Sequence, residues 1–272
     1  MATSSEKREE FNEKAKPIKN AIKEVLEKEK KELSEVKKNP DGVAYRKLML
    51  ADQMIYLATL YMAVNTLSVQ ILDFKNNDSL NDARKTIYKA LIYLEEVVSN
   101  TVDCAYSDLE DKLATIADIT IEKRFYLVRK LGLVIDMLVE AFGDNSKWKM
   151  SFVEIRGRFI VIAKNMIDMK KACKDYYDPH SPDYENSILY IRLIRKLLDK
   201  SADEYRDKYE LAGNRIDDMQ TGINLLIAAR RVAMVLGDKD ASEEIKRKAL
   251  VWKNKLDADT KKSSTKKLQM TI

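Results

Sequence analysis

The chain has 272 residues, of which 45% are hydrophobic and 34% charged, with a net charge of +5 at neutral pH. It contains one histidine, seven glycines, four prolines and two cysteines. The single histidine argues against histidine-based metal and acid–base sites within one chain. The scattered glycines argue against the glycine-rich loops that bind nucleotide phosphates. So few glycines and prolines also predict long helices.

The positive charge is concentrated at the carboxyl end of the chain. Four lysines and no acidic residue lie within 261–272, and they account for all but one of the net charges. We therefore expect no extended basic surface for nucleic acid over the rest of the chain. The first residues are charged and lack the apolar core of a secretory signal. With two reduced cysteines in helical segments, the protein is expected to be cytoplasmic.

The first predicted helix covers 5–38 and has one narrow apolar stripe, and Pro17 predicts a kink or a later start of this helix. An Asn-Pro-Asp-Gly turn at 39–42 separates it from a second helix over 43–75. The second helix is apolar on several faces, which is typical of a helix surrounded by others. Its segment 54–72 is uncharged and close to membrane-spanning length. Polar residues interrupt this segment, so we expect a buried central helix and no transmembrane span.

The third predicted helix runs unbroken over 79–117, and a fourth follows and ends at Gly143. The fifth carries a coiled-coil-like seam, because its apolar residues recur in alternating steps of four and three. Gly157 lies within this helix at a cost of about 1 kcal/mol relative to alanine, and a close helix neighbour is one reason for it. The seam residues are Trp148, Phe152, Ile155, Phe159, Ile162, Met166, Met169 and Cys173.

The same alternation continues from Tyr184 to Leu226, with Arg195 as the one exception, and its phase passes through Gly213 and Asn214. The sequence favours one helix over 182–236, about 80 Å long at 1.5 Å per residue. Two shorter helices are the alternative. A last helix follows Gly237, with a capping-box pattern at its start. The segment 259–272 is expected to be a basic, disordered tail.

These elements predict an all-α fold: one domain over 1–258, built as an elongated bundle of six to eight long helices with coiled-coil-like seams. No catalytic, cofactor-binding or metal-binding residue is predicted. We expect a non-enzymatic protein-interaction or scaffolding protein that presents an elongated helical surface to a protein partner. The alternative is a protein that binds an acidic surface, nucleic acid or anionic membrane, through its basic tail.

The candidate partner-binding residues are tyrosines and basic residues. Tyrosine combines a large apolar area with a polar hydroxyl and is common at protein interfaces. Packing within the bundle is the alternative explanation for these tyrosines, and self-association is left open. The candidates are Tyr176, Tyr177, Tyr205, Tyr209, Arg230, Arg231, Lys266 and Lys267.

Overall fold

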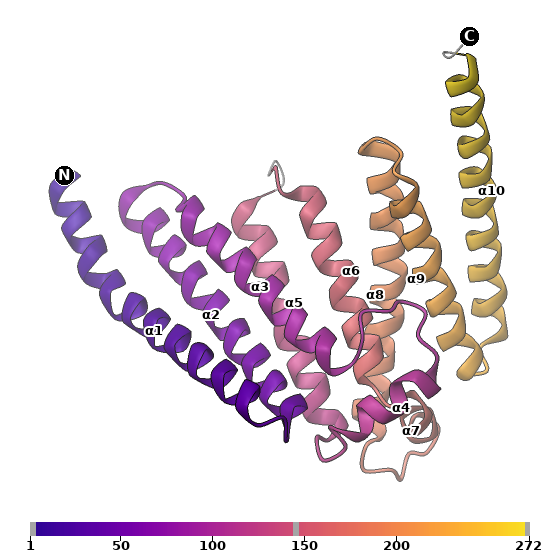
Figure 1. Cartoon of the computed structure of the whole chain (residues 1–272), viewed down its shortest axis with the longest axis horizontal. Coiled ribbons are helices and arrows are strands. Elements are labelled where there is room, and N and C mark those ends of the chain that lie inside the picture. Colours follow the sequence, from indigo (N-terminus) through magenta and orange to yellow (C-terminus); the bar gives the residue numbers. More distant parts are fainter. Residues whose placement is uncertain (1–3, 144–146, 270–272) are drawn as a thin grey trace. The chain divides into compact units, whose positions relative to one another are not determined.

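The computed structural model describes residues 4–143 and 147–269 (Figure 1). Over these residues the chain forms ten helices and no strand, and 84% of it is helical. This confirms the all-α prediction. The helices outnumber the predicted six to eight because three of the predicted helices are each broken in two. The ten are α1 (Ser4–Lys38), α2 (Val43–Leu72), α3 (Asn77–Val97), α4 (Tyr106–Ala114), α5 (Ile121–Phe142), α6 (Lys149–Met166), α7 (Met169–Tyr176), α8 (Tyr184–Leu211), α9 (Ile216–Val235) and α10 (Lys239–Gln269).

The chain divides into two compact units. The first comprises Met1–Ser99 and Glu110–Lys149, and the second comprises Asn100–Leu109 and Met150–Ile272. The prediction of a single domain over 1–258 stays a prediction, since compact units of this kind occur within domains as well as between them.

In the first unit, α2 packs against α1, α3 and α5. Leu50, Ala51 and Met54 of α2 are fully buried, as expected for a central helix. By length and composition α2 could cross a membrane, a test that the core helix of a soluble protein also passes. Its neighbour α1 continues through Pro17 and buries a narrow apolar stripe that includes Phe11 and Ile22.

The single helix predicted over 79–117 is wrong. α3 ends at Val97 and α4 begins at Tyr106. The segment between them is rich in short polar and β-branched residues, which favour the helical conformation less than alanine or leucine does. Ser99 has a φ of 148°, far from helical geometry. The chain also passes from the first unit to the second at this point.

Much of the apolar stripe predicted for the fifth helix is buried in the second unit, where Phe152, Ile155, Phe159, Ile162 and Met166 lie on α6. Gly157 is also buried, beside the ring of Tyr205, in line with the close helix neighbour expected for it. α6 packs on α8, and the hydroxyl of Tyr190 donates a hydrogen bond to the carbonyl oxygen of Ala163 over 2.9 Å.

Both ends of that predicted seam differ from the prediction. Trp148 belongs to the first unit, where the guanidinium of Arg84 lies 3.8 Å from the centroid of its ring. At the other end the helix stops at Met166. The carboxylate of Asp168 then accepts a hydrogen bond from the backbone N–H of Lys171, which caps the amino end of α7.

The one long helix predicted over 182–236 is also wrong. α8 ends at Leu211, α9 begins at Ile216, and the two pack side by side as a hairpin (Figure 1). Gly213 and Asn214 have φ values of 92° and 54°, a left-handed conformation that glycine and asparagine adopt most readily. The connecting loop has about as many residues as one helical turn, so the apolar residues stay in phase across the break.

The last helix, α10, packs against α9 and buries Trp252 and Leu256. No glycine or proline lies within its sequence, so nothing ends it near residue 258. The described part of the predicted disordered tail, 259–269, is therefore helical. The remainder, 270–272, lies outside the described residues.

Candidate functional site

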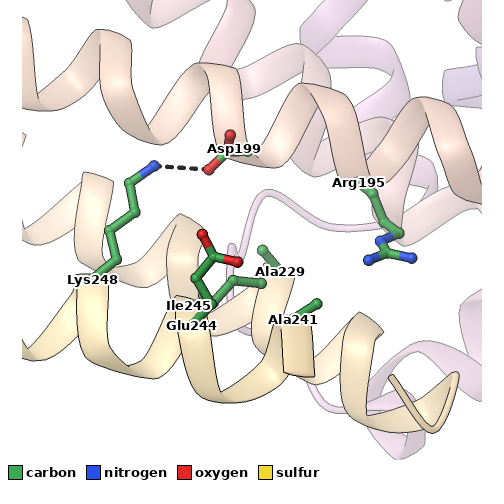
Figure 2. A pocket seen from close by; sticks show the side chains of 7 residues that line it. All are labelled: Arg195, Asp199, Ala229, Ala241, Glu244, Ile245 and Lys248. Atoms are coloured by element: carbon green, nitrogen blue, oxygen red, sulfur yellow. Dashed lines mark hydrogen bonds and ion pairs between the residues drawn. The ribbon is translucent and has the colours of Figure 1, made fainter. Parts of the chain in front are cut away.

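A pocket of about 290 Å³ opens between α8, α9 and α10 in the second unit (Figure 2). Residues three and four apart share one face of a helix, and this spacing brings Arg195 and Asp199 of α8 to the pocket. The same spacing aligns the lining residues of α10. Short alanine side chains leave the space open. The apolar part of the lining is Ala229, Ala241 and Ile245.

Lys248 lies on the pocket wall between two carboxylates of α8. Its Nζ is 2.8 Å from Asp199 and 3.0 Å from Asp203. Burial opposes the charge of Lys248, but the two carboxylates together outweigh it and raise the pKa of this lysine. The ammonium group is therefore held in its charged form and is already satisfied by the protein.

Arg195 is the second cation of the pocket, and a carboxylate satisfies it as well. Its guanidinium is 2.7 Å from Asp238. Asp238 also accepts a hydrogen bond from the backbone N–H of Ala241, so Asp238 caps α10 in place of the predicted capping box. The backbone N–H of Ala241 and then Arg195 lower the pKa of Asp238.

Glu244 differs from the other charged residues of the lining. It forms no hydrogen bond or ion pair with the described part of the chain. Figure 2 shows Glu244 and Ile245 projecting from α10 into the space below α8. The charges of the lining balance, with Asp199 and Glu244 against Arg195 and Lys248. Asp203 and Asp238 lie beside the two cations but outside the lining.

The four candidate tyrosines fall into two groups. Tyr176 and Tyr177 meet edge to face at the end of α7, with ring centroids 5.0 Å apart. Tyr177 remains 62% exposed and donates its hydroxyl to the carbonyl oxygen of Leu236. Tyr205 and Tyr209 are buried in the second unit, so they pack within the bundle and are not available to a partner.

The candidate basic residues do not form one free patch. Arg231 lies 3.0 Å from Asp103, and the Nε of Arg230 is buried without a hydrogen-bond partner in the described structure. Lys266 and Lys267 belong to the last turns of α10, and their side chains lie outside the described residues. The structure therefore brings none of the predicted site residues into the pocket.

The sequence did not single out the pocket residues as a site. In the sequence, Arg195 stands out only as an exception in an apolar stripe, and Glu244 belongs to a charged stretch typical of a solvated helix face. The available signal was spacing: a charged residue four positions after Arg195, and another four positions after Glu244. Such spacing is common in highly charged helices. It identifies a site only when the packing of three helices around a pocket is also known.

Among the described residues, no cluster of histidine, cysteine, aspartate and glutamate side chains could hold a metal ion. No curated protein and no solved structure matches the chain. A family model described as the TP0443 family matches residues 7–260, which is nearly the whole sequence. The chain therefore belongs to the TP0443 family.

Proposed function

We propose that this chain is a non-enzymatic protein-interaction protein, and that the α8–α9–α10 pocket receives a basic side chain from a protein partner. One observation carries the proposal. The two cations of the pocket are neutralised by neighbouring carboxylates, whereas Glu244 forms no ion pair and lies next to the apolar residues of the lining.

A lysine or arginine side chain has the chemistry that this arrangement would bind. Its methylene stem can lie against Ala229, Ala241 and Ile245, while its charged end reaches Glu244. A charge-assisted hydrogen bond to a carboxylate is stronger than a neutral one. The volume of about 290 Å³ is at the lower end of the range of about 300–1,000 Å³ typical of small-molecule sites, and it suits one or two side chains.

The electrostatics of the lining support binding over catalysis. A general base or a nucleophilic lysine works best when its pKa lies near the working pH. Asp199 and Asp203 shift the pKa of Lys248 in the opposite direction. Arg195 is committed to Asp238. These groups are suited to holding α8 against α10 and the loop that precedes it.

The predicted elongated bundle with coiled-coil-like seams belongs to the same proposal. Its support is the stripe of five buried residues at alternating steps along α6. Stiff, closely packed helices would hold a binding pocket in one shape and so limit the entropy lost on binding. A cytoplasmic location remains part of this proposal.

The test is affinity capture from native lysate with the wild type, Glu244→Lys and Glu243→Lys. Both variants add the same charge to the same turn of α10, but Glu243 does not line the pocket and pairs with Lys246. We expect the wild type and Glu243→Lys to capture the same protein and Glu244→Lys to lose it. The captured protein is then purified, its contacting lysine or arginine is found by cross-linking, and the affinity is measured calorimetrically.

Equal capture by all three proteins would contradict the proposal. A truncation after Thr260 addresses the alternative, because it removes the four lysines of 261–272. If the basic segment is the binding element, the truncated protein alone loses binding to acidic vesicles or nucleic acid, and that binding weakens steeply with salt.

A further inference from the structure

Large apolar side chains form an exposed line along α5 in the first unit. Tyr126, Leu133 and Met137 are 65%, 60% and 49% exposed. Their spacings of seven and four residues place them on one face of the helix. Single exposed apolar residues are common, but a contiguous group of them on a surface marks an interaction site.

α2 lies parallel to α5 beside this line. Three contacts fix the alignment, one near the start of the helices, one in the middle and one at their ends. Because all three join residues at corresponding heights, the two helices run in the same direction. The contacts are Tyr45 with Asp118 at 3.2 Å, Lys130 with Asp52, and Lys75 with the carbonyl oxygen of Phe142 at 3.3 Å.

This alignment extends the apolar surface onto α2. Met49 and Tyr56 lie one turn on either side of Asp52, and both are more than half exposed. Lys130, which pairs with Asp52, lies between Tyr126 and Leu133 along α5. Two apolar lines therefore flank one ion pair. We call this surface the α2–α5 face; it consists of Met49, Tyr56, Tyr126, Leu133 and Met137.

The other edge of the face carries charges of opposite sign. At about 100° per residue, Arg129 and Asp136 both lie roughly 40–60° to one side of Leu133, while Lys130 lies to the other side, toward α2. Neither Arg129 nor Asp136 forms an ion pair with any described residue. They are seven residues apart, so they occupy equivalent positions one heptad apart on the helix.

We infer that the α2–α5 face binds the same face of a second copy of this chain, with the two α5 helices antiparallel about a two-fold axis near Leu133. A two-fold interface brings the same patch of both copies together. In an antiparallel pair, the edge of α5 that carries Arg129 and Asp136 lies against the same edge of the other copy. The residues of the two edges then run in opposite order. Arg129 of each copy then meets Asp136 of the other, and Leu133 meets Leu133.

The order of the charges decides between the two directions of pairing. A parallel two-fold pair would place the edge that carries Arg129 and Asp136 against the opposite edge of the other α5, so these two residues would not meet. The antiparallel arrangement forms two equivalent ion pairs. An amphipathic helix of another protein, or the second unit of the same chain, are the other occupants that the experiment distinguishes.

The test measures the molar mass of the full chain by sedimentation equilibrium over a range of concentrations. We expect the wild type to dimerise and Leu133→Asp to be monomeric. The matched control is Leu250→Asp, because Leu250 of α10 is similarly exposed at 56% but lies outside the α2–α5 face. Both positions are on the surface, so circular dichroism should show an intact fold for both variants.

A charge exchange then tests the direction of pairing. Arg129→Glu and Asp136→Arg should each weaken self-association roughly tenfold or more, because each creates two repulsive contacts. Mixing the two variants should restore a dimer, since one copy then carries two acidic residues and the other two arginines. A monomeric wild type, an unchanged dimer in Leu133→Asp, or a mixture that stays monomeric would each overturn the inference.

Discussion

Gly157 of α6 packs against the ring of Tyr205 of α8, and its replacement by alanine gives a sharp test of that packing. A Cβ atom at this position would lie 2.5 Å from Cε2 and 2.7 Å from the hydroxyl oxygen of Tyr205. Ordinary contact begins at 3.4 Å. The buried ring of Tyr205 would have to move by about 1 Å within a close-packed interior.

Two opposing terms set the size of the effect. Overpacking a well-filled core costs about 1–3 kcal/mol. Replacing glycine by alanine inside a helix contributes about 1 kcal/mol in the opposite direction. We therefore expect Gly157→Ala to lower the free energy of unfolding by up to about 2 kcal/mol, although alanine is the better helix former.

The assay is urea denaturation followed by circular dichroism, in the wild type and in a Tyr205→Leu background. In that background the ring is absent, so Gly157→Ala should become neutral or stabilising by up to about 1 kcal/mol. The difference between the two backgrounds measures the coupling of the two positions. The same loss of stability in both backgrounds would refute the assignment of the clash to Tyr205.

Three further results are expected. Phe159→Ala should cost about 3–5 kcal/mol in chemical denaturation, because Phe159 is a buried core side chain; a much smaller loss would mean that this part of α6 is not core. Burial lowers the pKa of Lys164, so the folded protein releases this proton at a lower pH than the unfolded chain and stability rises with pH in that window. Lys164→Met should therefore stabilise the protein at neutral pH, with a gain that shrinks as the pH rises toward the ordinary lysine pKa; a gain independent of pH would contradict this cause. Four glycine and serine residues inserted after Ala212 double the loop and should cost about 0.6 kcal/mol, whereas a loss several times larger would argue against a simple hairpin loop.

Helix ends that are encoded locally were predictable from the sequence. The turn at 39–42 places the start of α2 at Val43, as predicted, and Gly143 follows the end of α5. In each case a short run of turn-forming residues, or a glycine with positive φ, interrupts the helical pattern.

Breaks that leave the apolar spacing unchanged were not predictable. Met166 and Met169 keep helical spacing although Asp168 starts a new helix between them. Gly213 lies in a loop that replaces about one turn of helix. The apolar residues therefore keep the same spacing before and after the loop, as they would in one continuous helix. Hydrophobic spacing records which side of a segment is buried, and it does not record whether the backbone reverses.

The candidate pocket was not predictable for a related reason. Glu244 and Arg195 acquire their roles only when α8 and α10 lie next to each other, and that adjacency depends on the hairpin at Gly213. From the sequence, the pocket charges look like those of any solvated helix face. Their pairing depends on which helices pack together, whereas the sequence pattern shows only which residues share a face of one helix.

The path of the chain also limits how parts of this protein can be exchanged by recombination. Asn100–Leu109 belongs to the second unit but precedes Glu110–Lys149, which belongs to the first. That short segment supplies Asp103 to Arg231 and the carbonyl oxygen of Thr101 to Asn165. A single recombination break therefore cannot exchange one unit without removing a segment from the other. The two units are therefore interleaved in the sequence, and no single cut of the chain separates them.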